Sequence, residues 1–134
     1  MQNVRVIQAS KFLDNRGSLH VIEYEKELPF VVKRVYYVNA KTNCLRGQHA
    51  HLRLKQLMFC VGGSCKLYLD NGRESTTIVL DAPEKCVIIE PCVWREMYDF
   101  SDNATLIVLA SETYDETDYV RDYESFNRIT KGIE

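Results

Sequence analysis

The chain has no block of like charge and no long apolar run. Its 17 lysines and arginines are interspersed with 19 aspartates and glutamates, for a net charge of −2. Without a run of five or six basic residues, it offers no electrostatic footprint for nucleic acid or an anionic membrane. No stretch approaches the ~20 apolar residues of a membrane-spanning helix, and residues 1–12 lack the apolar centre of a signal peptide. We expect a cytoplasmic protein that binds neither nucleic acid nor membrane.

The cysteines lack the spacing that is typical of metal sites and disulfide frameworks. None of the five cysteines forms a Cys-x-x-Cys pair, and their odd number argues against a disulfide framework. Most lie in apolar runs such as residues 57–61, where a thiol acts as a small buried hydrophobic group. With 46% hydrophobic residues, the 134-residue chain has enough apolar side chains to build a core unaided. We expect one domain over residues 1–134.

Short stretches rich in Val, Ile, Tyr and Phe recur about every ten residues between Gly, Asn, Asp and Pro, a rhythm typical of all-β proteins. The sequence Asn71-Gly72 predicts a hairpin with a type I′ turn. Tyr119, Tyr123 and Phe126, spaced by four and three, predict a short amphipathic helix near the C-terminus. We therefore expect a sandwich or barrel of antiparallel strands with a short C-terminal helix. The predicted strands are residues 18–24, 30–38, 47–53, 56–61, 64–70, 74–80, 85–90, 93–99 and 104–111.

Histidine is scarce, yet two of the three histidines, His49 and His51, are one residue apart in a predicted strand. Alternate side chains of a strand share one face, so both imidazoles can enter the same cavity. Histidine is also the side chain that titrates closest to neutral pH. Two inward-facing imidazoles are a costly way to fill a core, so the pair predicts a site of proton transfer or metal binding.

The spacing from His49 and His51 through Gln56 to Gly63 resembles the first sequence motif of the cupins. Their second motif is only partly represented, by residues 91–96 with Glu96 at the place of its histidine. In metal-binding cupins the two histidines, a glutamate and the later histidine hold one divalent ion. Here an amide stands where the glutamate belongs, which makes a poor donor set. We expect no metal and no cofactor.

A closer resemblance spans nearly the whole chain. Six blocks in order resemble the dTDP-4-keto-6-deoxyglucose 3,4-ketoisomerases, which are sugar isomerases of the cupin class. The blocks are residues 14–19 (DNRGSL), 30–37 (FVVKRVYY), 46–51 (RGQHAH), 63–65 (GSC), 93–101 (VWREMYDFS) and 109–119 (LASETYDETDY). The resemblance implies a cupin-type jelly-roll barrel, usually a homodimer. It also implies a metal-independent exchange of keto and hydroxyl groups at carbons 3 and 4 of a dTDP-linked hexose. This exchange leads to 3-amino-3,6-dideoxy sugars of bacterial surface glycans.

Moving a carbonyl from carbon 4 to carbon 3 requires loss of the carbon 3 proton, an enediolate and protonation of carbon 4. A base that titrates near neutral pH suits both proton transfers. We assign this role to His51, with His49 orienting or sharing the proton, although which histidine does which is open. Tyr36 and Tyr37 point to opposite sides of their strand, and the resemblance favours Tyr37 as the group that hydrogen-bonds the oxyanion.

The dTDP-linked 4-keto-6-deoxy sugar carries two phosphates and a flat base, so its pocket needs cations and an aromatic surface. The candidate diphosphate ligands are Arg16, Arg46 and, less directly, Arg34. Trp94 either stacks on a ring or closes the barrel mouth, and Arg95 either contacts the sugar or tunes its placement. The acidic run at residues 115–118 is expected to be solvated or to cap a helix.

Two other classes of function are compatible with the sequence. In a metal-dependent cupin enzyme, such as a dioxygenase or a metal isomerase, Glu96 completes the site. In a non-catalytic sugar-binding cupin, the histidines bind ligand without turnover. Within the isomerases, an epimerase acting at carbons 3 and 5 is a near neighbour, which would exchange the proton on carbon 5 with solvent.

Overall fold

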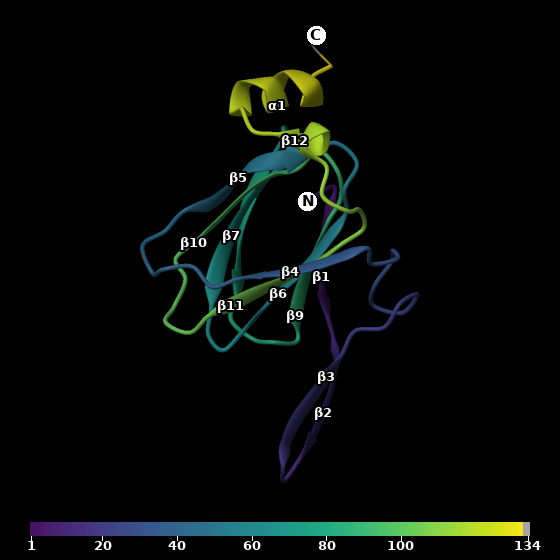
Figure 1. Ribbon diagram of the computed structural model, residues 1–134, viewed down its shortest axis with the longest axis vertical. Coiled ribbons are helices and arrows are strands. Elements are labelled where there is room, and N and C mark those ends of the chain that lie inside the picture. The colour runs from purple at the N-terminus through teal and green to yellow at the C-terminus, as the bar shows by residue number, and fades with distance from the viewer. Residues whose placement is uncertain (133–134) are drawn as a thin grey trace.

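The computed structural model describes residues 1–132, and within this range the chain is almost entirely β-structure (Figure 1). The elements are β1 (Val4–Gln8), β2 (Ser10–Asp14), β3 (Gly17–Val21), β4 (Arg34–Val38), β5 (Arg46–His51), β6 (Gln56–Val61), β7 (Cys65–Asp70), β8 (Ser75–Leu80), β9 (Lys85–Ile89), β10 (Trp94–Tyr98), β11 (Thr105–Ala110), the 3₁₀ helix η1 (Glu116–Asp118), β12 (Tyr119–Val120) and α1 (Tyr123–Thr130).

Two five-stranded antiparallel sheets form the body of the molecule. The first has the strand order β1-β9-β6-β11-β4 and the second β12-β5-β10-β7-β8. Strands such as β11 alternate fully buried and half-buried side chains, because one side of each sheet faces the other sheet. This arrangement confirms the expected all-β, antiparallel sandwich or barrel with a short C-terminal helix.

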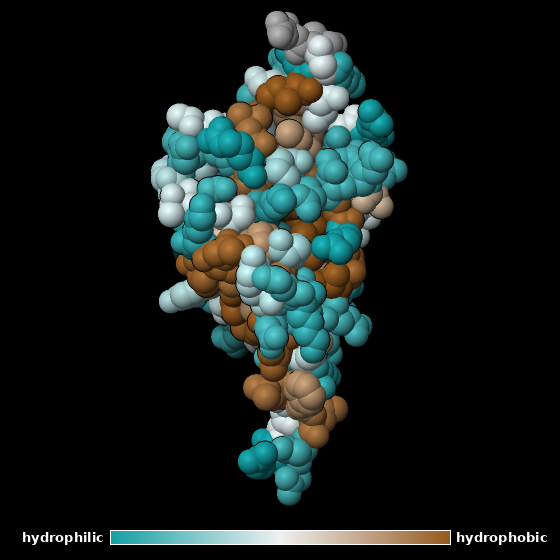
Figure 2. All heavy atoms as spheres, turned by 90° about the vertical axis from the view of Figure 1, so that its right-hand side faces the viewer, coloured by the Kyte–Doolittle hydropathy of each residue, from teal (hydrophilic) through white to brown (hydrophobic). Residues whose placement is uncertain are grey.

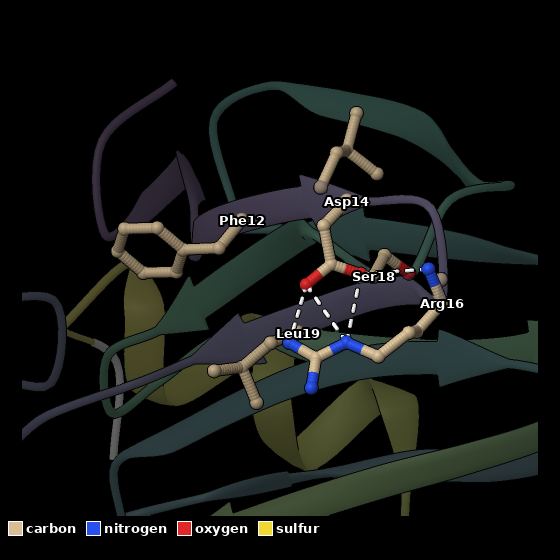
Figure 3. Close-up of a pocket in the computed structure, with 7 residues that line it drawn as sticks. Phe12, Asp14, Arg16, Ser18 and Leu19 are labelled. Atoms are coloured by element: carbon tan, nitrogen blue, oxygen red, sulfur yellow. Dashed lines mark hydrogen bonds and ion pairs between the residues drawn. The ribbon is translucent and has the colours of Figure 1, made fainter.

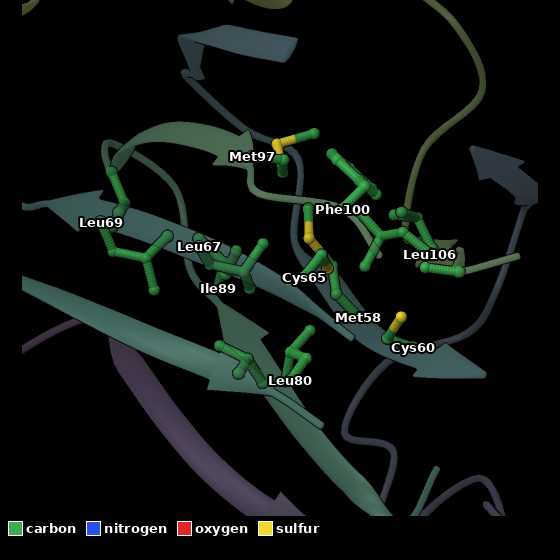
Figure 4. Close-up of a cluster of buried hydrophobic side chains, with 14 residues drawn as sticks. Met58, Cys60, Cys65, Leu67, Leu69, Leu80, Ile89, Met97, Phe100 and Leu106 are labelled. Atoms are coloured by element: carbon green, nitrogen blue, oxygen red, sulfur yellow. The ribbon is translucent and has the colours of Figure 1, made fainter. Parts of the chain in front are cut away.

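The core lies between the two sheets (Figure 4). Leu67 and Leu69 of β7 meet Met58 of β6 and Leu106 of β11, and these side chains are fully buried. Cys60 and Cys65 are buried with them, Cys86 is buried in a second cluster with Leu57 and Ile88, and all five cysteines are free thiols. The prediction that cysteine acts here as a small hydrophobic group is confirmed.

Strands β2 and β3 form a separate two-stranded hairpin that extends away from the body, at the end opposite α1 (Figure 1). We call residues 10–21 the arm. Each arm strand pairs only with the other. The side chains of Phe12, Leu13 and Leu19 are 60%, 70% and 61% exposed, and Figure 2 shows apolar residues gathered on this narrow end of the molecule.

The sequence prediction missed β1 and β2 and overextended several later strands, most of all the one at residues 30–38. Residues 1–12 contain β1 and most of β2, although their polar composition hides the alternation. The strand predicted over residues 30–38 begins only at Arg34, because side chains of residues 22–32 form an irregular cover over Leu57 and Ile88.

The hairpin between β7 and β8 is confirmed, but its turn is not of type I′. That turn needs positive φ at both central residues, whereas only Gly72, at φ 90°, has it. The side chain of Asn71 instead accepts hydrogen bonds from the amides of Arg73 and Glu74. The C-terminal helix begins at Tyr123, and Tyr119 belongs to the short strand β12.

Helix α1 covers the end of the barrel, where its Phe126 packs against Ala50, Trp94 and Val120. Asp122 caps the helix by accepting a hydrogen bond from the amide of Ser125 at 3.1 Å. Among the described residues, no helix combines the length and the apolar character needed to cross a membrane.

Candidate active site

The two histidines of β5 lie together inside the barrel. The ring centroids of His49 and His51 are 4.8 Å apart with an interplanar angle of 87°. A bulge in β5 sets their direction: His49 pairs with Arg95 and Gly47 with Glu96, while Gln48 between them has no partner and a φ of 57°. The two imidazoles lie side by side as expected, but only His49 borders the cavity that both were expected to enter.

The histidines differ in access. His49 lines a cavity of about 330 Å³, whereas His51 is 1% exposed and lies behind it. The cavity is lined by Arg34, Tyr36, Val38, Arg46, Gly47, His49, Met97, Tyr119 and Arg121. Tyr119 packs against both imidazoles, with its ring centroid 4.9 Å from that of His49 and 4.4 Å from that of His51.

Each imidazole is tied through its Nδ1 atom. His49 Nδ1 lies 3.0 Å from the carbonyl oxygen of Gly47, and His51 Nδ1 lies 3.0 Å from Oδ2 of Asp118. A carbonyl or carboxylate oxygen only accepts, so both Nδ1 atoms donate. In the neutral ring Nε2 then carries the free lone pair. Both rings therefore present a basic nitrogen away from their anchors.

The environment keeps both rings neutral. Burial, and next the positive charge of Arg95, lowers the pKa of His49 to about 4, against the opposing effect of its hydrogen bond to Gly47. The same two causes lower the pKa of His51 well below its ordinary value. At neutral pH each imidazole is therefore unprotonated and able to accept a proton.

Arg95 lies beneath the histidines rather than in the cavity. It is 1% exposed, and its guanidinium donates to Oε1 of Gln56 and to the carbonyl oxygen of Val93. Gln56 in turn donates from Nε2 to the hydroxyl of Tyr36 at 2.9 Å. Burial lowers the pKa of Arg95 to about 10, so it remains charged at neutral pH. Arg95 is thus a buried cation that does not line the cavity, which contradicts the prediction that it contacts the sugar directly.

The donor set does not fit a metal ion. Both ends of the Gln56 amide are engaged, one of them by a guanidinium. Glu96 accepts a hydrogen bond from Nε1 of Trp94 at 2.9 Å. Within residues 1–132 no group of three or more His, Cys, Asp and Glu is arranged to hold a metal. The alternative in which Glu96 completes a metal site has no support in this geometry.

The structure corrects the choice between the two tyrosines. β4 pairs with β11 so that Tyr36 lies opposite the buried Val108 and Tyr37 opposite Ile107. Tyr36 therefore lines the cavity, while Tyr37 points outward and is 70% exposed. Strand alternation correctly predicts that only one of them enters, but it cannot say which.

Of the four other side chains predicted to bind the substrate, two line the cavity and two do not. Arg34 and Arg46 line the cavity. Arg16 is at the tip of the arm, paired with Asp14, and does not reach the cavity of its own chain (Figure 3). The hollow of about 500 Å³ in which it lies is built from arm residues alone. Trp94 packs on α1 and closes the end of the barrel.

Sequence reasoning missed three residues of the site, all from residues 116–121. Asp118 is buried rather than solvated, Tyr119 covers the histidines, and Arg121 lines the cavity. Arg121 forms two hydrogen bonds to the carboxylate of Glu116 and lies 4.2 Å from the ring centroid of Tyr119. These residues reach β5 only through the pairing of β12 with it, which no local pattern reveals.

An antiparallel barrel with a pair of histidines in its mouth defines this chain as a protein of the cupin class. Residues 2–131 match the family described as FdtA: WxcM-like, C-terminal. The chain belongs to this family of sugar 3,4-ketoisomerases, and it is an isomerase.

The relatives cover the chain almost completely. The TDP-4-oxo-6-deoxy-alpha-D-glucose-3,4-oxoisomerase of Aneurinibacillus thermoaerophilus is 46% identical over 99% of this chain and 96% of its own. A variant of the 3,4-ketoisomerase QdtA from Thermoanaerobacterium thermosaccharolyticum, solved with TDP-4-keto-6-deoxyglucose, superimposes with a TM-score of 0.95 and 40% identity over 98% of this chain and 96% of its own. A 3,4-ketoisomerase from Helicobacter canadensis gives a TM-score of 0.93 and 40% identity over 98% and 99%.

Proposed function

We propose that this protein converts dTDP-4-keto-6-deoxyglucose into the 3-keto isomer by proton transfer through the two imidazoles of β5. The observation that carries the proposal is the pair of neutral histidines, one lining a cavity that three arginines also line. The QdtA variant that is 40% identical was solved with TDP-4-keto-6-deoxyglucose. A nucleotide sugar of this kind is thus the substrate that we assign.

The lining of the cavity supports His49 as the base that removes the proton from carbon 3. His49 is the histidine that borders the cavity, and its Nε2 is unprotonated because Nδ1 donates to Gly47. His51, behind it, shares this proton, and the protonated pair of imidazoles delivers a proton to carbon 4 of the enediolate while the proton of the 3-hydroxyl passes to the oxygen on carbon 4. This order reverses the sequence-based assignment, in which His51 was the base. General bases of this type contribute about 10²–10⁴-fold in rate.

The cavity also supports a binding mode for the substrate. Arg34, Arg46 and Arg121 supply the positive charge that two phosphates require. The hydroxyl of Tyr36 accepts a hydrogen bond from Gln56, which leaves its proton free to donate to the oxyanion that forms on the sugar. Burial raises the pKa of Tyr36, so it is a hydrogen-bond donor at neutral pH.

Incubation with dTDP-4-keto-6-deoxyglucose in heavy water, followed by NMR, tests this reaction. We expect a new ketone at carbon 3 and deuterium at carbon 4, because the proton delivered there comes from a solvent-exchanged group. Deuterium at carbon 5 with the ketone unmoved would show an epimerase instead. Unchanged substrate across a range of pH would refute the proposal.

Substitution of the histidines tests their roles. His49→Asn should reduce turnover by about 10²–10⁴-fold and abolish exchange at carbon 3, while binding of dTDP stays within a few-fold. The matched control is His20→Asn, on the arm, which should retain full activity. A His49→Asn enzyme with near-normal turnover would remove His49 from its assigned role.

We also propose that the protein is a homodimer in which the arm contacts a second copy of the chain. Both sides of the arm carry exposed apolar residues, Phe12 and Leu19 on one and Leu13 on the other. Both of its long edges have unpaired backbone groups outside the hairpin. Apolar surface of this kind on a protruding hairpin is typical of an interface.

Light scattering at several concentrations tests the dimer. The chain has a mass of 15.6 kDa, so a dimer should have twice that mass. Leu13→Asp combined with Leu19→Asp should give the single-chain mass. Ile129→Asp, an exposed apolar position on α1 far from the arm, should leave the dimer intact. A wild-type monomer, or an arm variant that stays dimeric, would contradict this interface.

The cellular location follows from the same proposal. Five free thiols suit a reducing compartment, since disulfides form in oxidising ones. We therefore place the enzyme in the cytoplasm, a location that fractionation of the host cells would test.

A further inference from the structure

Asp118 lies in the wall of the barrel directly behind His51. Its side chain is 6% exposed, and its Oδ2 atom is 3.0 Å from His51 Nδ1. The two residues are far apart in sequence and meet because β12 pairs with β5, Tyr119 opposite His51. The carboxylate is therefore part of the site, yet it does not border the cavity.

The carboxylate is itself held in place by backbone amides. Its Oδ1 accepts from the amide of Arg53 at 2.7 Å, and its Oδ2 accepts from that of Leu54 at 3.3 Å. The amide of Leu52 donates to the backbone oxygen of Asp118 at 2.9 Å. These bonds fix the position of both oxygens relative to β5, so the carboxylate is held in one orientation toward the imidazole.

This arrangement decides which nitrogen of His51 carries the proton. A carboxylate is only an acceptor, so Nδ1 must donate to it. Nε2 of the neutral ring is then an open lone pair. This atom is buried and has no hydrogen-bond partner among the described residues, and a buried polar atom without a partner is unusual outside functional sites.

We propose that Asp118 is a positioning residue, which holds His51 in the tautomer and orientation that keep Nε2 ready to accept a proton during the reaction. The effect on rate rests on the proposed ketoisomerase function. The effect on the tautomer does not, because it follows from the hydrogen bonds alone. Once Nε2 takes a proton, the adjacent carboxylate also stabilises the resulting imidazolium.

The variant Asp118→Asn separates positioning from a purely structural role. Its side-chain oxygen, at the place of Oδ1, still accepts from the amide of Arg53, while the longer bond of 3.3 Å from the amide of Leu54 to Oδ2 is lost. Its NH₂ group then faces His51 Nδ1 and can only donate. This forces Nδ1 to become the acceptor and moves the proton to Nε2, which removes the basic lone pair.

The experiment is ¹⁵N NMR of histidine-labelled protein at neutral pH, with His51 assigned by comparison with His51→Gln. We expect the proton on Nδ1 in the wild type and on Nε2 in Asp118→Asn. In the same variant kcat should fall about 10²–10⁴-fold with KM and Tm little changed. Asp115→Asn, which removes the same charge from an exposed position on the same turn, should change neither the tautomer nor kcat.

Two results would overturn the proposal: a wild-type His51 with its proton on Nε2, or an Asp118→Asn variant that keeps the wild-type tautomer or rate. If the variant does not fold, the wild-type spectrum still tests the proposal, because it shows which nitrogen of His51 carries the proton. A wild type without turnover on dTDP-4-keto-6-deoxyglucose would refute the proposed function and leave the tautomer result standing.

Discussion

The barrel mouth and the arm are both built from short antiparallel strands, but they differ in which side chains are buried. In β5 the residues His49, Ala50 and His51 are all buried, although two of them are polar. In β2 four of five residues are exposed, although Phe12 and Leu13 are apolar. The placement of polar and apolar groups is thus inverted between the two regions.

This inversion shows that residue type alone does not decide burial in this fold. The mouth is covered by β12 and α1, and its histidines are held by fixed acceptors, Gly47 of β5 and Asp118 of η1. No other strand of the described chain pairs with the arm, which contacts the body through polar groups such as Lys11 and His20 beside Glu84. Each region departs from the rule that apolar groups are buried, and each departure marks a proposed site of function.

The strongest test of the comparison is the same truncation in both regions. Leu67→Ala, in the closed core, should lower the free energy of unfolding by about 2–5 kcal/mol, because it leaves a cavity among fully buried neighbours. Leu13→Ala, on the arm, should change the stability of the single chain by no more than about 0.5 kcal/mol. Urea denaturation measures both.

Protein concentration separates the two effects further. Any larger loss in Leu13→Ala should depend on concentration, because it reports association rather than packing. The loss in Leu67→Ala should persist at every concentration. A Leu13→Ala variant with a large, concentration-independent loss would show that the arm packs on its own chain.

The pH dependence of activity tests how far the mouth is shielded from water. A pKa of about 4 for His49 predicts that kcat/KM stays high as the pH falls below 6.5 and declines only near pH 4. The free energy of unfolding should change with pH in the same direction as the activity. Because the folded pKa lies below the ordinary value of about 6.5, the unfolded chain binds the proton first. The free energy of unfolding therefore decreases as the pH falls from about 6.5 to about 4.

Rapid assays after a pH jump measure the decline of kcat/KM at low pH, with circular dichroism as a check on folding. A decline centred at pH 6.5 would mean that His49 titrates as if exposed to water in the free enzyme. The contrast between mouth and arm would then be much weaker.

Much of the barrel follows from local sequence. The predicted strand at residues 56–61 coincides with β6, and those at 64–70 and 93–99 differ from β7 and β10 by one residue at one or both ends. Alternation and turn residues are sufficient there because each strand packs one face on the core. In the arm, the strand predicted over residues 18–24 overlaps β3, but β2 was missed because its side chains are mostly exposed and follow no alternation of buried and exposed positions.

The site is less predictable because it is assembled across the fold. The His49–His51 pair is visible in the sequence since two side chains on one strand are linked by the backbone itself. Tyr36 depends on the register of β4 against β11, and Asp118 on a two-residue strand. Arg95 was predicted to contact substrate, but its strand directs it beneath the histidines, where Gln56 binds it. Such contacts arise only when distant strands pair.

The smallest expected effect comes from one methyl group added at a glycine in each region. Gly47 and Gly17 both have positive φ, 87° and 136°, so alanine is strained at either position. A Cβ atom on Gly17 meets nothing within 4 Å, whereas one on Gly47 falls 2.9 Å from the backbone oxygen of Arg95 and 2.8 Å from Met97 Sδ. The difference between Gly47→Ala and Gly17→Ala therefore isolates the crowding at the mouth, for which we expect about 1–3 kcal/mol in the free energy of unfolding.

Because the Gly47 carbonyl anchors His49, Gly47→Ala should also lower kcat while Gly17→Ala does not. Equal losses of stability and equal activity in the two variants would show that the bulge beside His49 is as loosely packed as the tip of the arm.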